Sequence, residues 1–218
     1  KAPVWNDDVK FFVIEDKEGK EIAGFYMDLY ARSGKRGGAW MNDQISRREV
    51  NGKIQKPIAY LVCNFAAPVG DNPSLLTLRD VETIFHEFGH GLHHMLTRQT
   101  ELAVSGISGV EWDAVEMPSQ FMENFVLNWD VMQTITHHVK TGKTMPRELF
   151  DKLVAAKNYG AGMANVRQIE FALFDMLLHM DTHPEKDAVQ KILTAVRKEV
   201  AVTFPPEYNR FAYSFSHI

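Results

Sequence analysis

The feature that most constrains this chain is the pentad His86-Glu87-Phe88-Gly89-His90, which lies inside a long stretch with helical periodicity. Residues four apart lie on one face of an α-helix, so both imidazoles can point at a single metal ion. Zn²⁺ accepts two histidines at this spacing, and the Glu between them can act as general base toward a water molecule. The pentad therefore predicts a zinc site with Glu87 beside it.

The segment around the pentad, residues 77–96, has the features of a buried helix. It contains no proline, and Thr77 and Asp80 form an acidic variant of the capping box at its start. We expect His93 to be a core residue or to support a ligand, and His94 to lie at the surface. Apolar residues recur at intervals of three and four, as in a helix packed into a core: Val81, Ile84, Phe85, Phe88, Leu92, Met95 and Leu96.

A third protein ligand must come from elsewhere, because a catalytic zinc takes three side chains and leaves one position for water. Glu111, Asp113 and Glu116 follow the helix and are all candidates, and the spacing does not choose among them. Pro118 is expected to bend this turn and to aim one carboxylate inward. Asp113 and Glu82 are also candidates for orienting a ligand imidazole, with solvation at a helix end as the alternative.

Two runs of residues carry a resemblance to a known family. HEFGHGLH at residues 86–93 and GVEWDAVEMPSQFMENF at residues 109–125 resemble the thimet oligopeptidase family of zinc endopeptidases, most closely its bacterial members. RGGAW at residues 36–40 and FSH at residues 215–217 extend the likeness over essentially the whole chain. In that family the third ligand is the Glu directly before x-Pro-Ser-Gln, which implies Glu116 here. The resemblance also implies His217 as a histidine that contacts substrate.

The resemblance implies a zinc metallopeptidase that hydrolyses internal bonds of short oligopeptides. One Zn²⁺ would be held by His86, His90 and Glu116, with Glu87 as general base and then general acid. A dipeptidyl carboxypeptidase of the same family is one alternative, and a zinc-binding scaffold without turnover is another. Family members are much longer and carry a Tyr-rich loop after the point that corresponds to Ile218. We therefore expect the remainder of the enzyme to be missing from this chain, which leaves a catalytically incomplete zinc-binding core as a third alternative.

The fold class predicted from the sequence is α+β, mostly helical, with a small antiparallel sheet before a helical zinc-binding core of zincin type. Strands are predicted at residues 11–15 and 22–30, which form a hairpin, and at 37–41 and 58–65 around an Asn51-Gly52 turn. The chain is expected to be one unit, β-rich over residues 1–66 and helical over 77–218. After the pentad helix, further helices are predicted at residues 113–136, 147–158, 163–180 and 185–202.

Gly37-Gly38-Ala39-Trp40 is a candidate edge for binding a peptide substrate. A zinc peptidase commonly pairs its substrate with the edge of a sheet, where main-chain hydrogen bonds hold any sequence. Small residues such as Gly38 and Ala39 would let a substrate backbone come close. The equal alternative is that the glycines only shape a turn.

Composition excludes several other classes of protein. A net charge of -4 with dispersed Lys and Arg argues against a nucleic-acid partner. The single Cys63 cannot form an internal disulfide, and no apolar run of about 18 residues indicates a membrane span. We therefore expect a cytoplasmic protein that acts on short peptides without a membrane partner, and the resemblance adds that it is a monomer.

Overall fold

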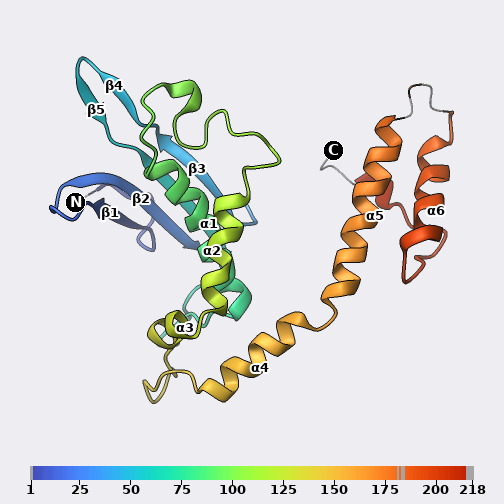
Figure 1. Cartoon of the computed structure of the whole chain (residues 1–218). Coiled ribbons are helices and arrows are strands. Elements are labelled where there is room, and N and C mark those ends of the chain that lie inside the picture. Colours follow the sequence, from blue (N-terminus) through green and yellow to red (C-terminus); the bar gives the residue numbers. More distant parts are fainter. Residues whose placement is uncertain (1, 181, 183–184, 215–218) are drawn as a thin grey trace. The chain divides into compact units, whose positions relative to one another are not determined.

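The computed structural model describes residues 2–180, 182 and 185–214 (Figure 1). The chain forms two compact units, Lys1–Met145 and Pro146–Ile218, where we expect one from the sequence. No run of Gly or Ser precedes Pro146, so composition does not mark this boundary. His217, expected to contact substrate, lies outside the described residues.

A four-stranded sheet with the order β1-β2-β6-β3 supports the first unit. β1 (Lys10–Glu15) and β2 (Glu21–Tyr30) form the predicted hairpin, and β6 (Ile58–Phe65) has the predicted bounds. β3 (Trp40–Ile45) begins later than predicted and pairs antiparallel with β6 at one edge of the sheet. β2 and β6 pair in parallel, so the sheet is mixed and the expectation of an antiparallel one is wrong. Hydrophobic alternation carries no information on strand direction, and the long connection between β2 and β6 allows the parallel crossover.

The connection between β3 and β6 contains a separate two-stranded hairpin, made of β4 (Arg48–Val50) and β5 (Lys53–Gln55). Asn51 and Gly52 form its turn with φ of 51° and 73°. Positive φ at both central residues is what a two-residue turn of the primed type requires. The predicted Asn51-Gly52 turn is therefore confirmed.

Helix α1 (Leu78–Met95) carries the pentad and packs against the sheet through β6, β3 and β2. The Thr77 side chain accepts a hydrogen bond from the backbone N–H of Asp80, whose carboxylate accepts one from the N–H of Thr77, as the capping box predicts. The rings of Phe25 and Phe88 lie 5.5 Å apart in the interface. Its buried core consists of Ala23, Phe25, Ala59, Leu61 and Met95.

The helix predicted over residues 113–136 is broken into three pieces. They are α2 (Met117–Glu123), the 3₁₀ helix η2 (Asn124–Leu127) and α3 (Trp129–Ile135), preceded by the 3₁₀ turn η1 (Leu102–Val104). Asn128 ends the second piece, and its side chain accepts hydrogen bonds from the N–H groups of Asp130 and Val131. A new N-cap at Asn128 therefore restarts the helix in a different direction.

The second unit consists of α4 (Arg147–Asn158), α5 (Ala161–Met180), α6 (Ala188–Val200) and α7 (Phe211–Ser214). α4 has the predicted bounds, and α5 and α6 lie within two or three residues of theirs. α5 and α6 pack together around buried Phe174, Leu193 and Val196, while Arg197 Nε donates a 2.9 Å hydrogen bond to buried Glu170. Within the described residues, no helix combines the length and apolar character needed to cross a bilayer.

A buried carboxylate fixes the end of β2. Asp28 accepts hydrogen bonds from both terminal nitrogens of Arg32 at 2.7 Å, from Lys35 Nζ at 2.8 Å and from Trp5 Nε1 at 3.1 Å. Burial alone would raise the pKa of Asp28, but the hydrogen bonds from Arg32, Lys35 and Trp5 outweigh it and lower the pKa from 3.8 to about 2. The carboxylate is therefore ionised in the folded protein at all but very acidic pH.

We predict that Asp28→Asn lowers the free energy of unfolding by about 3 kcal/mol near neutral pH, because the buried Lys35 ammonium loses its anion. The folded state lowers the Asp28 pKa, so the stabilisation of about 2 kcal/mol from this shift is present above pH 4 and is lost as pH falls toward 2. The gap between wild type and variant, measured by urea unfolding, should narrow over that range.

The matched control is Glu21→Gln, on the same strand. Glu21 forms a 3.1 Å ion pair with Lys56 in which both side chains are about half exposed. Its loss should cost less than about 0.5 kcal/mol at any pH. Equal losses for the two variants would contradict the role assigned to the buried carboxylate.

Candidate metal centre

Helix α1 presents three polar side chains of the pentad in one cleft of the first unit. The rings of His86 and His90 lie 5.0 Å apart, as expected for residues one turn apart on one helix face. Glu87 is buried, with 6 % of its surface exposed. The helix therefore brings two metal-binding nitrogens and one enclosed carboxyl group to the same place.

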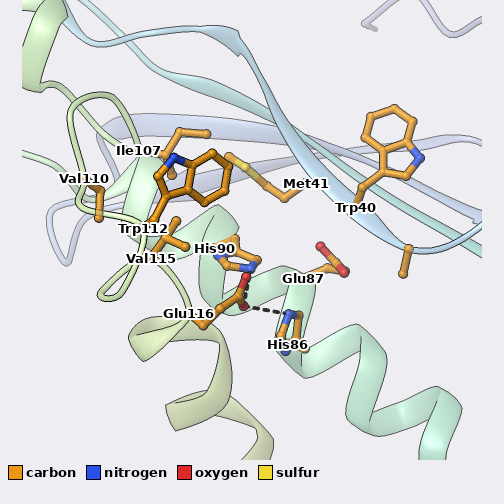
Figure 2. Close-up of a pocket in the computed structure, with 11 residues that line it drawn as sticks. Trp40, Met41, His86, Glu87, His90, Ile107, Val110, Trp112, Val115 and Glu116 are labelled. Carbon is orange, nitrogen blue, oxygen red and sulfur yellow. Dashed lines mark ion pairs between the residues drawn. The ribbon is translucent and has the colours of Figure 1, made fainter. Parts of the chain in front are cut away.

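Glu116 completes the group from the start of α2. Its Oε2 atom lies 3.2 Å from Nε2 of His86 and 3.1 Å from Nε2 of His90 (Figure 2). Around a tetrahedral zinc with bonds of about 2.0 Å, ligand atoms lie about 3.3 Å apart. The donor set and its spacing thus fit Zn²⁺, and the ligand atoms of these residues all lie within 4.8 Å of one another. Glu111 and Asp113, the other candidates, do not belong to this group of converging ligand atoms.

Close packing between α1 and α2 makes this convergence possible. A Cβ atom on Gly89 would lie 2.5 Å from the carbonyl oxygen of Pro118 and 2.6 Å from Cα of Ser119. Both are backbone atoms of α2, so only glycine permits this approach. Buried Ser119 then donates from Oγ to Oε2 and to the carbonyl oxygen of Glu116, both at 2.8 Å. Gly89 thus sets the distance between α1 and α2, and Ser119 restrains the carboxylate of Glu116.

A second carboxylate lies behind the first histidine. Nδ1 of His86 is 2.6 Å from Oε1 of Glu123. An ionised carboxylate only accepts, so Nδ1 carries the proton and the lone pair of Nε2 faces Glu116. Glu82 and Asp113 are the candidates that the sequence names for such a place, with solvation as the equal alternative, and Glu123 is missed. Its spacing could have indicated it, since Glu116 and Glu123 lie two turns apart on one helix face.

His94 corrects another expectation, because it is fully buried and not at the surface. Its Nε2 lies 3.0 Å from the carbonyl oxygen of Ile45, at the end of β3. A Cβ atom on Gly106 would collide with its Nδ1. The loop after η1 and the end of β3 both cover this part of α1, which helical periodicity cannot reveal. His93 is partly buried on the same helix.

The group lies in a cleft of about 440 Å³ whose other walls come from β3 and from the loop before α2. Ala39 lines the cleft, and Gly38 precedes it with φ of +83°. The carbonyl oxygen of Gly38 accepts a 2.7 Å hydrogen bond from the side-chain amide of Asn64. Gly38 thus shapes a turn that leads into the edge strand, and the binding of substrate along Gly38 and Ala39 stays a prediction.

Burial changes the ionisation of two of these groups. It raises the pKa of Glu87 to about 7, a rise that the charge of His86 opposes and the carboxylate of Glu116 increases. It lowers the pKa of His90, with Glu116 acting in the opposite direction. A carboxyl group that titrates near neutrality can both accept and donate a proton, and an unprotonated imidazole can bind a metal.

Comparisons with known proteins match the whole chain. The sequence profile described as Peptidase family M3 matches residues 1–218. Oligopeptidase A of Escherichia coli (strain K12) is 51 % identical over 217 residues, which cover 99 % of this chain and 32 % of that protein. The organellar oligopeptidase A of Arabidopsis thaliana is 48 % identical, over 100 % of this chain and 28 % of that protein. A dipeptidyl carboxypeptidase of Salmonella typhimurium is 35 % identical, over 99 % of this chain and 32 % of that protein. The chain spans about a third of the length of these relatives.

Gly89→Ala should lower zinc affinity at least about tenfold, because the new methyl group forces α2 and Glu116 away from the imidazoles. Competition with a chromophoric chelator measures the affinity, and circular dichroism checks that the variant folds. Gly91→Ala on the same helix is the control, since its Cβ would meet the ends of two side chains and no backbone, Leu61 at 2.8 Å and Met95 at 3.4 Å. Unchanged affinity in Gly89→Ala would contradict the packing argument.

Glu123→Ala should lower zinc affinity about 10- to 100-fold, because His86 loses the acceptor that fixes its tautomer and orientation. Isothermal titration with zinc measures the change. Gln120→Ala removes an exposed side chain from the same helix and should leave the affinity unchanged. If both variants bind zinc equally well, Glu123 does not position the ligand.

Proposed function

Because this chain belongs to peptidase family M3, we propose that it carries the metal centre of a zinc metallopeptidase that cleaves internal bonds of short oligopeptides. Zn²⁺ would be held by His86, His90 and Glu116. The observation that carries this proposal is the convergence of their three ligand atoms in the cleft that also contains buried Glu87. A binding scaffold would have no use for an enclosed carboxyl group at this place, which favours an enzyme.

In the proposed reaction the metal and Glu87 have separate roles. A bound zinc ion supplies Lewis-acid chemistry, polarising the scissile carbonyl and acidifying a water molecule. Glu87 accepts the proton of the attacking water and then donates it to the nitrogen of the leaving peptide. Glu123 keeps Nδ1 of His86 protonated, while Ser119 restrains the Glu116 carboxylate.

A dipeptidyl carboxypeptidase is the main alternative, since one such relative is 35 % identical to this chain. An enzyme of that kind needs a cation to bind the free carboxylate of its substrate. Among the described residues, the lining of the cleft includes His but neither Lys nor Arg. Cleavage of peptides blocked at both ends would support endopeptidase action, and cleavage only of peptides with a free carboxyl end would support the alternative.

A catalytically incomplete core is the other alternative, because the chain spans about a third of the length of its relatives. Groups that stabilise the oxyanion or close the cleft can lie in the rest of such a protein. Zinc binding without turnover by these 218 residues, together with turnover by a longer form, would support this alternative. We propose short peptides as the substrates and a single zinc per chain in either case; a cytoplasmic monomer stays a prediction.

We predict that Glu87→Gln keeps one zinc per chain and loses at least about 100-fold in turnover, because the amide cannot accept the proton of water. Metal content is measured by mass spectrometry, and turnover with a quenched fluorescent peptide blocked at both ends. Glu116→Gln should lose the bound zinc in addition to the turnover.

Glu111→Gln and Asp113→Asn are the controls, since both side chains are exposed in the segment before α2. Each should keep zinc and turnover. Ordinary turnover in Glu87→Gln, or loss of zinc in a control but not in Glu116→Gln, would overturn the assignment.

A further inference from the structure

A second cavity, of about 280 Å³, lies in the first unit beside the buried ion pair of Asp28 and Lys35. Trp40 and Met41 are neighbours on β3, so their side chains point to opposite faces of the sheet. Met41 packs against the core beneath α1, whereas Figure 2 shows the Trp40 ring pointing away from the three metal-ligand side chains. The second cavity therefore lies on the face of the sheet opposite α1, and it shares Trp40 with the metal cleft.

Three neighbouring strands supply the floor of this second cavity. Asp28 of β2, Val62 of β6 and Trp40 of β3 are paired across the sheet, so their side chains form one row on one face. Trp5 and Tyr60 add an aromatic wall, with their ring centroids 5.5 Å apart in an edge-to-face arrangement. Trp5 is half exposed, so the ring of a ligand placed beside it would cover apolar surface.

Arg32 is the cation of the cavity that can bind a further oxygen atom. Nζ of Lys35 lies within 3.0 Å of four oxygen atoms, more than its three protons can serve. Asp28 accepts hydrogen bonds from only two of the five N–H groups of Arg32. Among the described residues the Arg32 side chain has no other acceptor, so a carboxylate in the cavity can accept from it.

Trp40 supplies a second unused donor. Its Nε1 atom is buried and has no hydrogen-bond partner within the part of the chain that the structure describes. A buried N–H group without an acceptor is costly, and an oxygen atom of a bound molecule would satisfy it. The cavity thus offers a guanidinium and an indole N–H to the same ligand.

The charges around the cavity favour an anion. Arg32 and Lys35 line it, and the guanidinium of Arg36 lies 5.9 Å from the centroid of the Trp40 ring. Two carboxylates oppose these three cations. The hydrogen bonds to Asp28 raise the pKa of Arg32, and the charge of Asp8, which does not line the cavity, raises it further. One positive charge remains in excess, which disfavours a cationic ligand.

We propose that this second cavity binds a carboxylate attached to an aromatic group, with the carboxylate at Arg32 and Trp40 Nε1 and the ring against Trp5 and Tyr60. Two sources share this chemistry, a free aromatic acid and the C-terminal end of a peptide whose last residue is aromatic. The site goes beyond the proposed function, because it contains no metal ligand and needs no zinc. Hydrolysis in the cleft would supply ligands of the second kind, since each cleavage creates a new carboxyl end.

The test is isothermal titration of the zinc-loaded Glu87→Gln protein with matched ligands. N-acetyl-phenylalanine carries the carboxylate, and its amide lacks the charge. The acid should bind at least about tenfold more tightly than the amide. N-acetyl-alanine, which lacks the ring, should bind at least about tenfold more weakly than N-acetyl-phenylalanine. A carboxylate can also bind zinc, so the titration is repeated after a chelator has removed the metal, and the affinity should be unchanged.

Two variants locate the binding. Arg32→Gln should reduce the ratio of the acid and amide affinities to below about threefold, because the charge is lost. Trp40→Phe keeps a ring but removes the Nε1–H donor, and it should weaken binding of the acid at least about threefold. Circular dichroism checks that both variants fold. Arg48→Gln is the control, since it removes the same charge from an exposed side chain on the separate β4–β5 hairpin, and it should leave both affinities unchanged.

A peptide ligand distinguishes the two sources. Acetyl-Ala-Ala-Phe presents the same carboxyl end with two more residues. Tighter binding than N-acetyl-phenylalanine would assign the cavity to peptide ends, and equal or weaker binding would assign it to free aromatic acids.

Three results would overturn the second site and leave the proposed function standing. They are equal affinities for acid and amide, loss of binding when zinc is removed, and an unchanged ratio in Arg32→Gln. Binding of the acid to these 218 residues but not to a longer form of the protein would also overturn it, because another part of the same protein would then fill the cavity. Failure of wild type to bind zinc would contradict the proposed function, while the preference for the acid would still support the second site.

Discussion

The close approach of α1 and α2 at Gly89 is the constraint on which the site depends. The backbone of Pro118 and Ser119 lies where a side chain on Gly89 would be, so the two helices are in backbone contact. Glu116 stands one turn before this contact and reaches both imidazoles only because the contact is so close. A metal site needs its ligands held to within about 0.5 Å, and backbone packing holds them more firmly than flexible side chains can.

Hydrogen bonds then restrict the side-chain conformations that the packing of α1 against α2 still allows. Ser119 holds Oε2 of Glu116 from one side, and Glu123 holds His86 through its outer nitrogen. Both residues belong to α2, the helix that Glu116 begins. One short helix thus supplies a ligand, the group that restrains that ligand and the acceptor that orients a ligand on the neighbouring helix. A displacement of α2 would disturb all three at once, which couples the packing of the helix to the affinity for metal.

The sequence predicted best what local interactions determine. The capping box at Thr77 and the apolar periodicity fixed the bounds of α1, the family resemblance is confirmed over the whole chain, and the α+β class is correct. Contacts between distant segments decided the rest. The parallel pairing of β2 with β6 and the burial of His94 under the end of β3 depend on neighbours that periodicity does not identify. The break at Asn128 differs from these, because it comes from a local N-cap that the apolar periodicity obscured. Glu123 was missed because a carboxylate on an exposed helix turn is usually solvated, and only the position of α1 gives it a partner.

A network of hydrogen bonds centred on Lys35 positions the remaining wall of the cleft. The Lys35 side chain is buried, with 5 % exposed. Its ammonium donates to Asp28 and also to the carbonyl oxygens of Tyr30 and Cys63, at 2.8 and 2.6 Å, where the parallel strands β2 and β6 end side by side. Parallel strands leave such carbonyl groups at one edge, and a single cation there satisfies both while Asp28 balances its charge. Asn64 then holds the chain just before β3. The ion cluster at the end of the sheet therefore fixes where the edge strand begins, and with it one side of the cleft that faces the metal ligands.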